Sequence, residues 1–154
     1  MMIGSVSPIA ALSVPYMQRF TCDCGNVLFF GSSQCLSCGN QVGYDPVGDI
    51  MMTIRPGNWM KRCGNGLKYG VCNWLVDGNK GEVLCLACRM NRTIPDLTLG
   101  RNLQLWGRME SAKRRLVYTL LRIGITLPSK KDDAKSGLAF DIVSAIHHPE
   151  VTMG

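Results

Sequence analysis

The pattern of hydrophobic and polar residues divides this chain near residue 100. Before that point the apolar runs are short and are bounded by glycine, proline or polar residues, a pattern typical of strands joined by turns. Val27-Leu28-Phe29-Phe30 predicts one strand, and Met51-Met52-Thr53-Ile54 predicts a weaker one. Residues 73–76 and 82–84 predict a hairpin around the turn 77–81, because Asp-Gly is a common hairpin turn. The first part of the chain should therefore be rich in short strands.

After residue 100 the apolar spacing changes to that of a helix, predicted from Asn102, as N-cap, to Ile123, with Gly124 as its stop. Lys113 falls inside the apolar arc, and we expect it either to pair with Glu110 one turn earlier or to extend its ammonium group to solvent. The arc contains eight apolar residues, which are Leu105, Trp106, Met109, Ala112, Leu116, Val117, Leu120 and Ile123.

The opposite side of this helix carries a basic stripe, because Arg108, Arg115 and Arg122 follow one another at intervals of seven residues. Such a stripe is more often a solvated helix face than a phosphate-binding ridge. The three arginines are therefore a candidate polyanion-binding surface. We favour the alternative, in which they form an ordinary solvated face of the helix.

All eight cysteines lie between residues 22 and 88. They fall into pairs, two of which have the Cys-x-x-Cys spacing that lets two sulfurs reach one ion from a tight turn. Eight thiols are the number needed for two tetrahedral Cys₄ sites, and we predict two structural Zn²⁺ ions. The predicted ligands are Cys22, Cys24, Cys35 and Cys38 for one ion, and Cys63, Cys72, Cys85 and Cys88 for the other.

Neighbouring pairs are favoured over a cross-braced arrangement because the residues between Cys24 and Cys35 are expected to form one hairpin. Disulfides are the main alternative, but close spacings such as Cys22 to Cys24 suit them poorly. A redox-active dithiol at Cys35–Cys38 or Cys85–Cys88 is a further alternative, and it would need a βαβ setting that the pattern does not predict. A Cys₄ site also accepts iron, so the ligands alone do not separate the two metals.

Length and charge add limits to this picture. The chain has 154 residues and a formal charge of +6, which eight thiolates and two Zn²⁺ ions together lower to +2. That value weakens the case for a nucleic-acid partner. Residues 1–16 lack the basic start of a secretory signal, so we expect a disordered leader and a cytoplasmic protein without a membrane segment.

His147 and His148 stand beside Pro149, and we interpret them as a surface turn because adjacent histidines point to different faces of a helix. The residues from Gly137 to Ser144 are expected to form a strand or helix start that packs on the apolar face of the helix.

Several motifs together resemble a bacterial family in which a zinc ribbon precedes a metallopeptidase-like domain. The resemblance covers residues 17–154 and implies that the eight cysteines are structural ligands. It also implies that Glu110–Leu116 begins the peptidase-like part. The motifs are Phe20-Thr-Cys-Asp-Cys-Gly-Asn, Cys35-Leu-Ser-Cys-Gly, Cys63-Gly-Asn, Cys72-Asn-Trp-Leu-Val, Cys85-Leu-Ala-Cys-Arg-Met-Asn-Arg-Thr-Ile-Pro-Asp, Glu110-Ser-Ala-Lys-Arg-Arg-Leu and Gly137-Leu-Ala-Phe-Asp.

Proteins of that family are expected to carry a His-Glu-x-x-His helix, in which two imidazoles hold a catalytic zinc and the glutamate acts as general base. This sequence contains no such motif. We therefore expect an inactive structural zinc-binding module, the amino-terminal part of a longer metallopeptidase-like protein, whose partner is a further domain or another protein. The alternative is a zinc ribbon that binds nucleic acid or protein through the basic side of the helix.

The expected fold class is α+β, with a double zinc ribbon followed by an amphipathic helix that starts a second, incomplete α/β domain. The expected divisions are a leader (1–16), a first ribbon (17–45), a linker (46–60), a second ribbon with its tether (61–100) and the helix-led part (101–154). Trp59 and Trp74 are predicted to form the small core beside the zinc ions.

Overall fold

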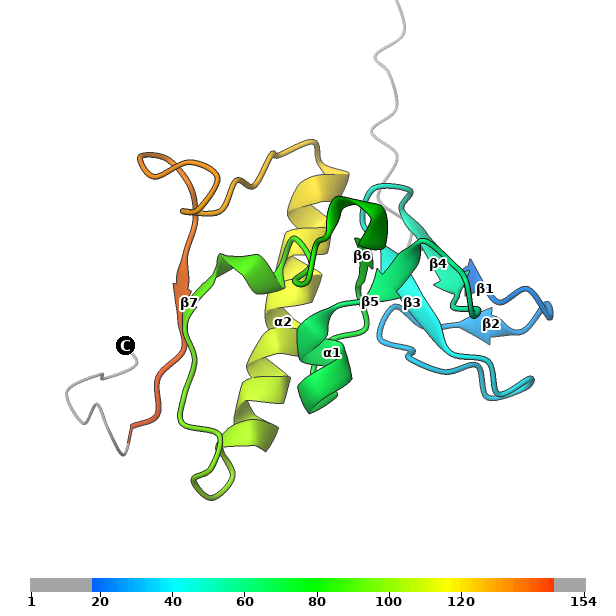
Figure 1. Cartoon of the computed structure of the whole chain (residues 1–154), viewed down its shortest axis with the longest axis horizontal. Coiled ribbons are helices and arrows are strands. Elements are labelled where there is room, and N and C mark those ends of the chain that lie inside the picture. Colours follow the sequence, from blue (N-terminus) through cyan, green and yellow to red (C-terminus); the bar gives the residue numbers. More distant parts are fainter. Residues whose placement is uncertain (1–17, 146–154) are drawn as a thin grey trace, which may run out of the picture.

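The computed structural model describes residues 18–145, so the predicted leader, His147 and His148 lie outside the described residues. Three antiparallel strand pairs are followed by a long helix, and a parallel strand pair joins the segments before and after that helix (Figure 1). The fold is thus α+β, with a β-rich part that contains both cysteine groups, as predicted. Within residues 18–145, no helix combines the length and the apolar character needed to span a membrane.

The first two strand pairs follow one another directly. Strand β1 (Phe20–Thr21) pairs with β2 (Val27–Leu28), and β3 (Val42–Asp45) pairs with β4 (Ile50–Thr53). Strand β4 confirms the weaker predicted strand and places part of the segment 46–60, predicted to be a linker, in a sheet. The predicted hairpin joining Cys24 to Cys35 is wrong, because each of these cysteines lies in its own turn. The β1–β2 pair flanks the first turn, and a bridge between Gln34 and Gln41 closes the second.

The third strand pair joins β5 (Met60–Arg62) to β6 (Leu75–Asp77), with helix α1 (Gly64–Tyr69) between them. The predicted hairpin of residues 73–76 with 82–84 is therefore wrong, and the short 3-10 helix η1 (Gly78–Lys80) occupies its turn. Pairing with β5 brings Cys63 alongside Trp74, whose carbonyl accepts a hydrogen bond from the Cys63 amide at 3.0 Å. This pairing brings Cys63 and Cys72 into one cluster. The predicted hairpin does not include the strand before Cys63 and would not bring it there.

An aromatic core connects the two cysteine-bearing parts. The ring of Tyr44 lies 5.0 Å from that of Trp74 and 5.1 Å from that of Phe30, measured between centroids. A β-bridge also joins Tyr44 to Trp74, and Tyr118 from the long helix packs on the Phe30 ring at 4.7 Å. Trp74 is fully buried, as predicted, but Trp59 is 51% exposed, so its assignment to the core is wrong. Because the aromatic cluster is continuous, the two metal-binding parts share one core.

Helix α2 (Asn102–Arg122) has the predicted length, and Gly124 after it has the positive φ of 81° expected at a helix stop. The N-cap is Arg101 rather than Asn102, whose side-chain amide instead donates to the carbonyl of Asp96 at 2.8 Å. The buried face also differs from the predicted apolar arc. Trp106 and Val117 are buried as expected, whereas five members of the arc are exposed, namely Leu105, Met109, Ala112, Leu116 and Ile123.

The last elements lie on the other side of α2 from the ribbon part (Figure 1). The 3-10 helix η2 (Cys88–Met90) leads into β7 (Asn91–Thr93), which pairs in parallel with β8 (Phe140–Asp141). An ion pair between Arg92 and Asp141 reinforces this contact. The segment 137–144 thus includes the predicted short strand.

Candidate metal centres

The first centre is built from two turns with the same sequence ending, Cys-Gly-Asn, at residues 24–26 and 38–40. In each turn the glycine amide donates to the carbonyl of the first cysteine, at 2.8 Å from Gly25 to Cys22 and 2.9 Å from Gly39 to Cys35. Both glycines have positive φ, 87° and 74°, which L side chains rarely adopt. The sequence therefore dictates two matching turns, and each presents two thiols on one side.

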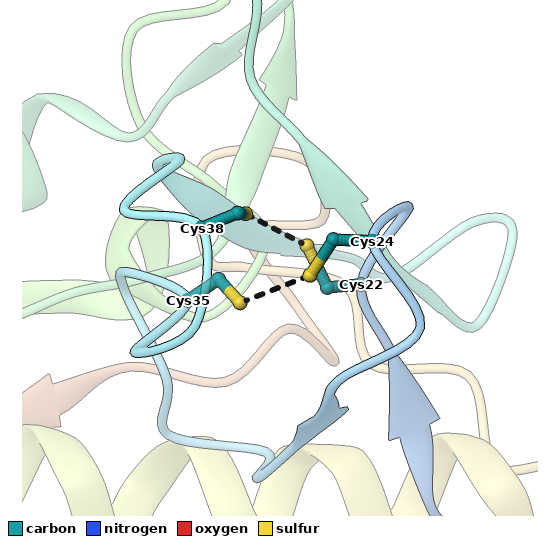
Figure 2. A group of neighbouring side chains, drawn as sticks. All are labelled: Cys22, Cys24, Cys35 and Cys38. Carbon is teal, nitrogen blue, oxygen red and sulfur yellow. Dashed lines mark hydrogen bonds between the residues drawn. The ribbon is translucent and has the colours of Figure 1, made fainter.

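The four thiols of this centre point toward one another from the two turns (Figure 2). The Cys22 and Cys38 sulfurs are 3.7 Å apart, and those of Cys24 and Cys35 are 3.6 Å apart. A disulfide would need about 2.05 Å, so these are not disulfides. Tetrahedral zinc with Zn–S bonds of about 2.3 Å separates its sulfurs by about 3.8 Å. The donor set and its spacing therefore fit zinc.

The second centre gathers Cys63, Cys72, Cys85 and Cys88, all of which are buried. Cys63 is the N-cap of α1, Cys72 precedes β6, and Cys88 begins η2. The sulfurs of Cys72 and Cys85 are 3.7 Å apart, the same spacing as in the first centre. Within each centre all four sulfurs lie within 4.8 Å of one another. The structure thus brings the cysteines together in the two neighbouring groups predicted from their order.

Backbone amides donate hydrogen bonds to two sulfurs of the second centre and so stabilise their negatively charged thiolate form. The amide of Trp74 donates to the Cys72 sulfur and that of Cys85 to the Cys63 sulfur, both at 3.4 Å. Such N–H···S contacts stabilise thiolates and orient metal ligands. In the first centre the Asn26 side-chain amide lies 3.7 Å from the Cys35 sulfur and plays the same part.

The thiols also shift one another's pKa values in opposite directions. The pKa of Cys35 falls to about 6, mainly because the Cys38 amide donates to it. The Asn40 amide lowers the pKa of Cys38, but partial desolvation and hydrogen bonds with the neighbouring thiols together outweigh it and raise the pKa to about 12. In the second centre, hydrogen bonds from the other thiols lower the pKa of Cys63, and the pKa of Cys88 is raised by its hydrogen bond to Cys63. Four adjacent thiols therefore lose all their protons readily only when a cation balances their charge.

These observations establish two structural zinc centres that differ in access to solvent. Two cysteines of the first centre, Cys24 and Cys38, are exposed, whereas all four of the second are buried. Each centre has four sulfur ligands, so no position is left for the water or substrate that a catalytic zinc binds.

A buried charged network connects the second centre to α2. The Cys88 sulfur lies 3.7 Å from Oε2 of Glu110, which is fully buried. The other carboxylate oxygen of Glu110 accepts hydrogen bonds from Lys113 at 2.7 Å, Asn91 at 2.9 Å and Trp106 at 3.1 Å. The pairing of Lys113 with Glu110 was one of the two predicted outcomes. The connection to Cys88 was not predicted, and the only signal for it in the sequence is two charged residues near the apolar arc.

A second buried charge fixes α2 to the end of α1. The guanidinium of Arg114, which is 8% exposed, donates to the carbonyl of Val71. Val71 directly precedes the ligand Cys72. The buried face of α2 therefore contacts the residues around the second centre through polar groups as well as apolar ones.

The structure separates the three arginines of the predicted basic stripe. Arg122 forms an ion pair with Asp49 and donates to the side chain of Gln18 at 2.7 Å. Arg108 and Arg115 are exposed and form no ion pair with residues 18–145. Two of the three therefore stay available to a ligand.

Comparison with known families agrees with this division of the chain. Residues 19–99 match the model of a zinc-ribbon domain, and residues 102–154 match a family described as "Putative zinc-binding metallo-peptidase". The family resemblance noted from the motifs is thus confirmed. The boundary between the two matches falls just before α2.

Two mycobacterial relatives match most of the chain. They are the uncharacterized proteins Rv2568c of Mycobacterium tuberculosis and Mb2598c of Mycobacterium bovis, each 34% identical over 139 residues. The matched part is 90% of this chain and 40% of each relative, so the chain spans less than half the length of these proteins. No solved structure matches the chain.

Proposed function

The chain belongs to the zinc-ribbon family, and from that premise we propose that it is the non-catalytic, zinc-binding module of a metallopeptidase-like protein. In this proposal the two zinc ions are structural, and the second of them holds α2 in position. Helix α2 is the first element of the segment that matches the peptidase family, so the module presents the start of that region on a metal-stabilised base.

The burial of Glu110 beside the ligand Cys88 carries this proposal. A carboxylate that is fully buried is costly unless it is paired and hydrogen-bonded, and here its donors are Asn91 of β7 and Lys113 and Trp106 of α2. Without the second zinc ion, Cys88 would lose the bond that fixes η2 and the strand β7 that directly follows it. Glu110 and Lys113 would then have to return to water, and the helix would leave the ribbon part.

The chemistry of the chain supports a role without catalysis. Both centres have complete sulfur coordination, and the sequence contains neither a His-Glu-x-x-His motif nor any histidine besides His147 and His148. Free thiolates suited to zinc also require a reducing compartment, from which we infer a cytoplasmic location.

Hydrogen exchange of the full zinc-loaded chain tests the proposal. The amides in the middle of α2 should be protected with zinc bound and should lose that protection in Cys88→Ser or after chelation. Cys38→Ser is the matched control, because it removes an exposed ligand of the first centre. Protection of α2 that survives loss of the second zinc contradicts the positioning role.

An activity assay tests the remaining claim. Zinc-loaded chain incubated with fluorogenic peptide substrates should show no hydrolysis above buffer. Hydrolysis that increases in proportion to the concentration of the chain, and that persists after repurification, would overturn the non-catalytic assignment.

A further inference from the structure

The solvent-facing side of α2 carries an apolar seam, which we define as Leu105, Met109, Leu116 and Ile123. Their side chains are 47%, 52%, 49% and 61% exposed. Intervals of four and seven residues place all four along one line of a helix. Single exposed aliphatic residues are ordinary, but a continuous line of them marks an interaction surface.

The first half of the seam opens into a groove. A hollow of about 420 Å³ lies between α2 and the segment that follows β8, and it is lined by Leu105, Met109, Ile142 and Val143, among others. The seam therefore has an apolar wall on one side near its start and is open farther along. A groove with one wall suits an elongated, mainly apolar segment.

The other side of the seam has a basic edge, defined as Arg101, Arg108 and Arg115. These residues also recur at intervals of seven, so they follow the seam along the helix. The only acidic residue in α2 is Glu110, which is buried on the opposite side. The exposed face thus combines an apolar line with a positive border, in which Arg108 and Arg115 form no ion pair with residues 18–145.

We propose that this face of α2 binds an amphipathic helix of a protein partner, with an apolar seam and an acidic edge. The proposal rests on the proposed function, because the seam is exposed only while α2 keeps its polar face against the second centre. Apolar contact along the seam supplies affinity, and pairing of acidic residues with Arg108 and Arg115 sets the orientation.

The same features argue against two other occupants. In an antiparallel pair of two copies, the basic edge of one α2 would lie against the basic edge of the other, and like charges disfavour that contact. Nucleic acid would use the arginines but would leave four aliphatic side chains facing a charged backbone. Arg122, which would extend the basic row, is already paired with Asp49.

Two synthetic peptides of the length of α2 provide the test. Both have a leucine seam at alternating intervals of four and three residues, and they differ only in having glutamate or lysine along one edge. Measured by fluorescence anisotropy at low salt on the full zinc-loaded chain, the glutamate peptide should bind at least tenfold more tightly. Leu116→Glu should weaken it at least tenfold, and Arg108→Glu with Arg115→Glu should reverse the preference. Val47→Glu is the control, because Val47 is exposed in the turn between β3 and β4, outside α2 and outside both cysteine groups.

Each other outcome has a defined meaning. Failure of both peptides to bind while hydrogen exchange shows α2 protected overturns this inference and leaves the proposed function standing. Unprotected α2 in the zinc-loaded chain overturns the proposed function itself. A dimer in sedimentation that Leu116→Glu dissolves identifies a second copy as the occupant. Displacement of the glutamate peptide by an oligonucleotide, with Leu116→Glu having no effect, identifies a polyanion surface. Both of these results overturn the proposal.

Discussion

Replacing Lys113 with methionine should reveal how strongly α2 depends on its buried ion pair. Methionine has a similar length but no charge, so the substitution leaves Glu110 ionised and buried without its cation. The side chains of Lys113 and Glu110 are only 4% and 0% exposed, and their charged atoms are 2.7 Å apart. Little solvent is therefore present to screen the charge that remains.

The expected magnitude follows from this burial. Removing one partner of a buried ion pair costs about 3–5 kcal/mol, because the other charge loses its compensation. Glu110 keeps its hydrogen bonds from Asn91 and Trp106, which favours the lower end, about 3 kcal/mol. Replacing both residues, with Glu110→Gln and Lys113→Met together, removes both charges and should cost about 1 kcal/mol.

Urea unfolding of the zinc-loaded protein provides the measurement, with the free energy taken from the midpoint and slope of a single transition. Arg115→Met is the matched control, because this residue is on the same helix but exposed, and it should change the free energy by less than about 0.5 kcal/mol. A loss below about 1 kcal/mol for Lys113→Met would refute the reasoning. So would a double variant that is less stable than the single one.

Three further changes test other parts of the structure. Gly66→Ala should destabilise the protein by about 2 kcal/mol in the same unfolding assay, because a Cβ at this position would lie 2.1 Å from the Cys72 carbonyl oxygen. Gly31→Ala is the control and should be neutral, because a Cβ there would have no other atom within 4 Å. Chelation should remove zinc from the first centre before the second, as two separate phases, since only the first has exposed ligands; one phase for both ions contradicts this. Burial and Asp49 raise the pKa of Tyr44, so the neutral phenol stabilises the fold below about pH 10, and that stability should fall as the pH rises further. Tyr44→Phe should flatten the alkaline loss, and an unchanged loss would refute the assignment.

The metal centres and the long helix could be predicted from the sequence because their determinants are local. A Cys-x-Cys or Cys-x-x-Cys spacing brings two sulfurs to one turn whatever the rest of the chain does, and Gly25 and Gly39 favour these two turns directly. Periodicity and Gly124 fix the extent of α2 in the same local way. These features need no knowledge of distant contacts.

The strand pairing and the buried side of α2 could not be predicted, because both depend on distant partners. Strand β6 pairs with β5 across the whole of α1, whereas local turn chemistry favoured a hairpin with residues 82–84. On α2, hydrophobicity indicated that Leu105 and Leu116 would be buried, but the helix instead buries Glu110 and Lys113 beside a thiol cluster. The hydrogen bonds and the ion pair of this network compensate the cost of burying two charges, and a hydropathy scale contains no information about such contacts.

The continuous aromatic core also has a consequence for how the protein should respond to temperature. The heat capacity change on unfolding comes mainly from apolar surface exposed to water, about 12–15 cal/mol/K per residue in ordinary domains. Here the buried hydrophobic set consists in good part of the cysteines themselves, and metal–sulfur bonds supply folding free energy that burial supplies elsewhere. We therefore expect a heat capacity change per residue below that range and a flatter dependence of stability on temperature. The concentration of free zinc, more than the temperature, then determines the fraction of the protein that is folded.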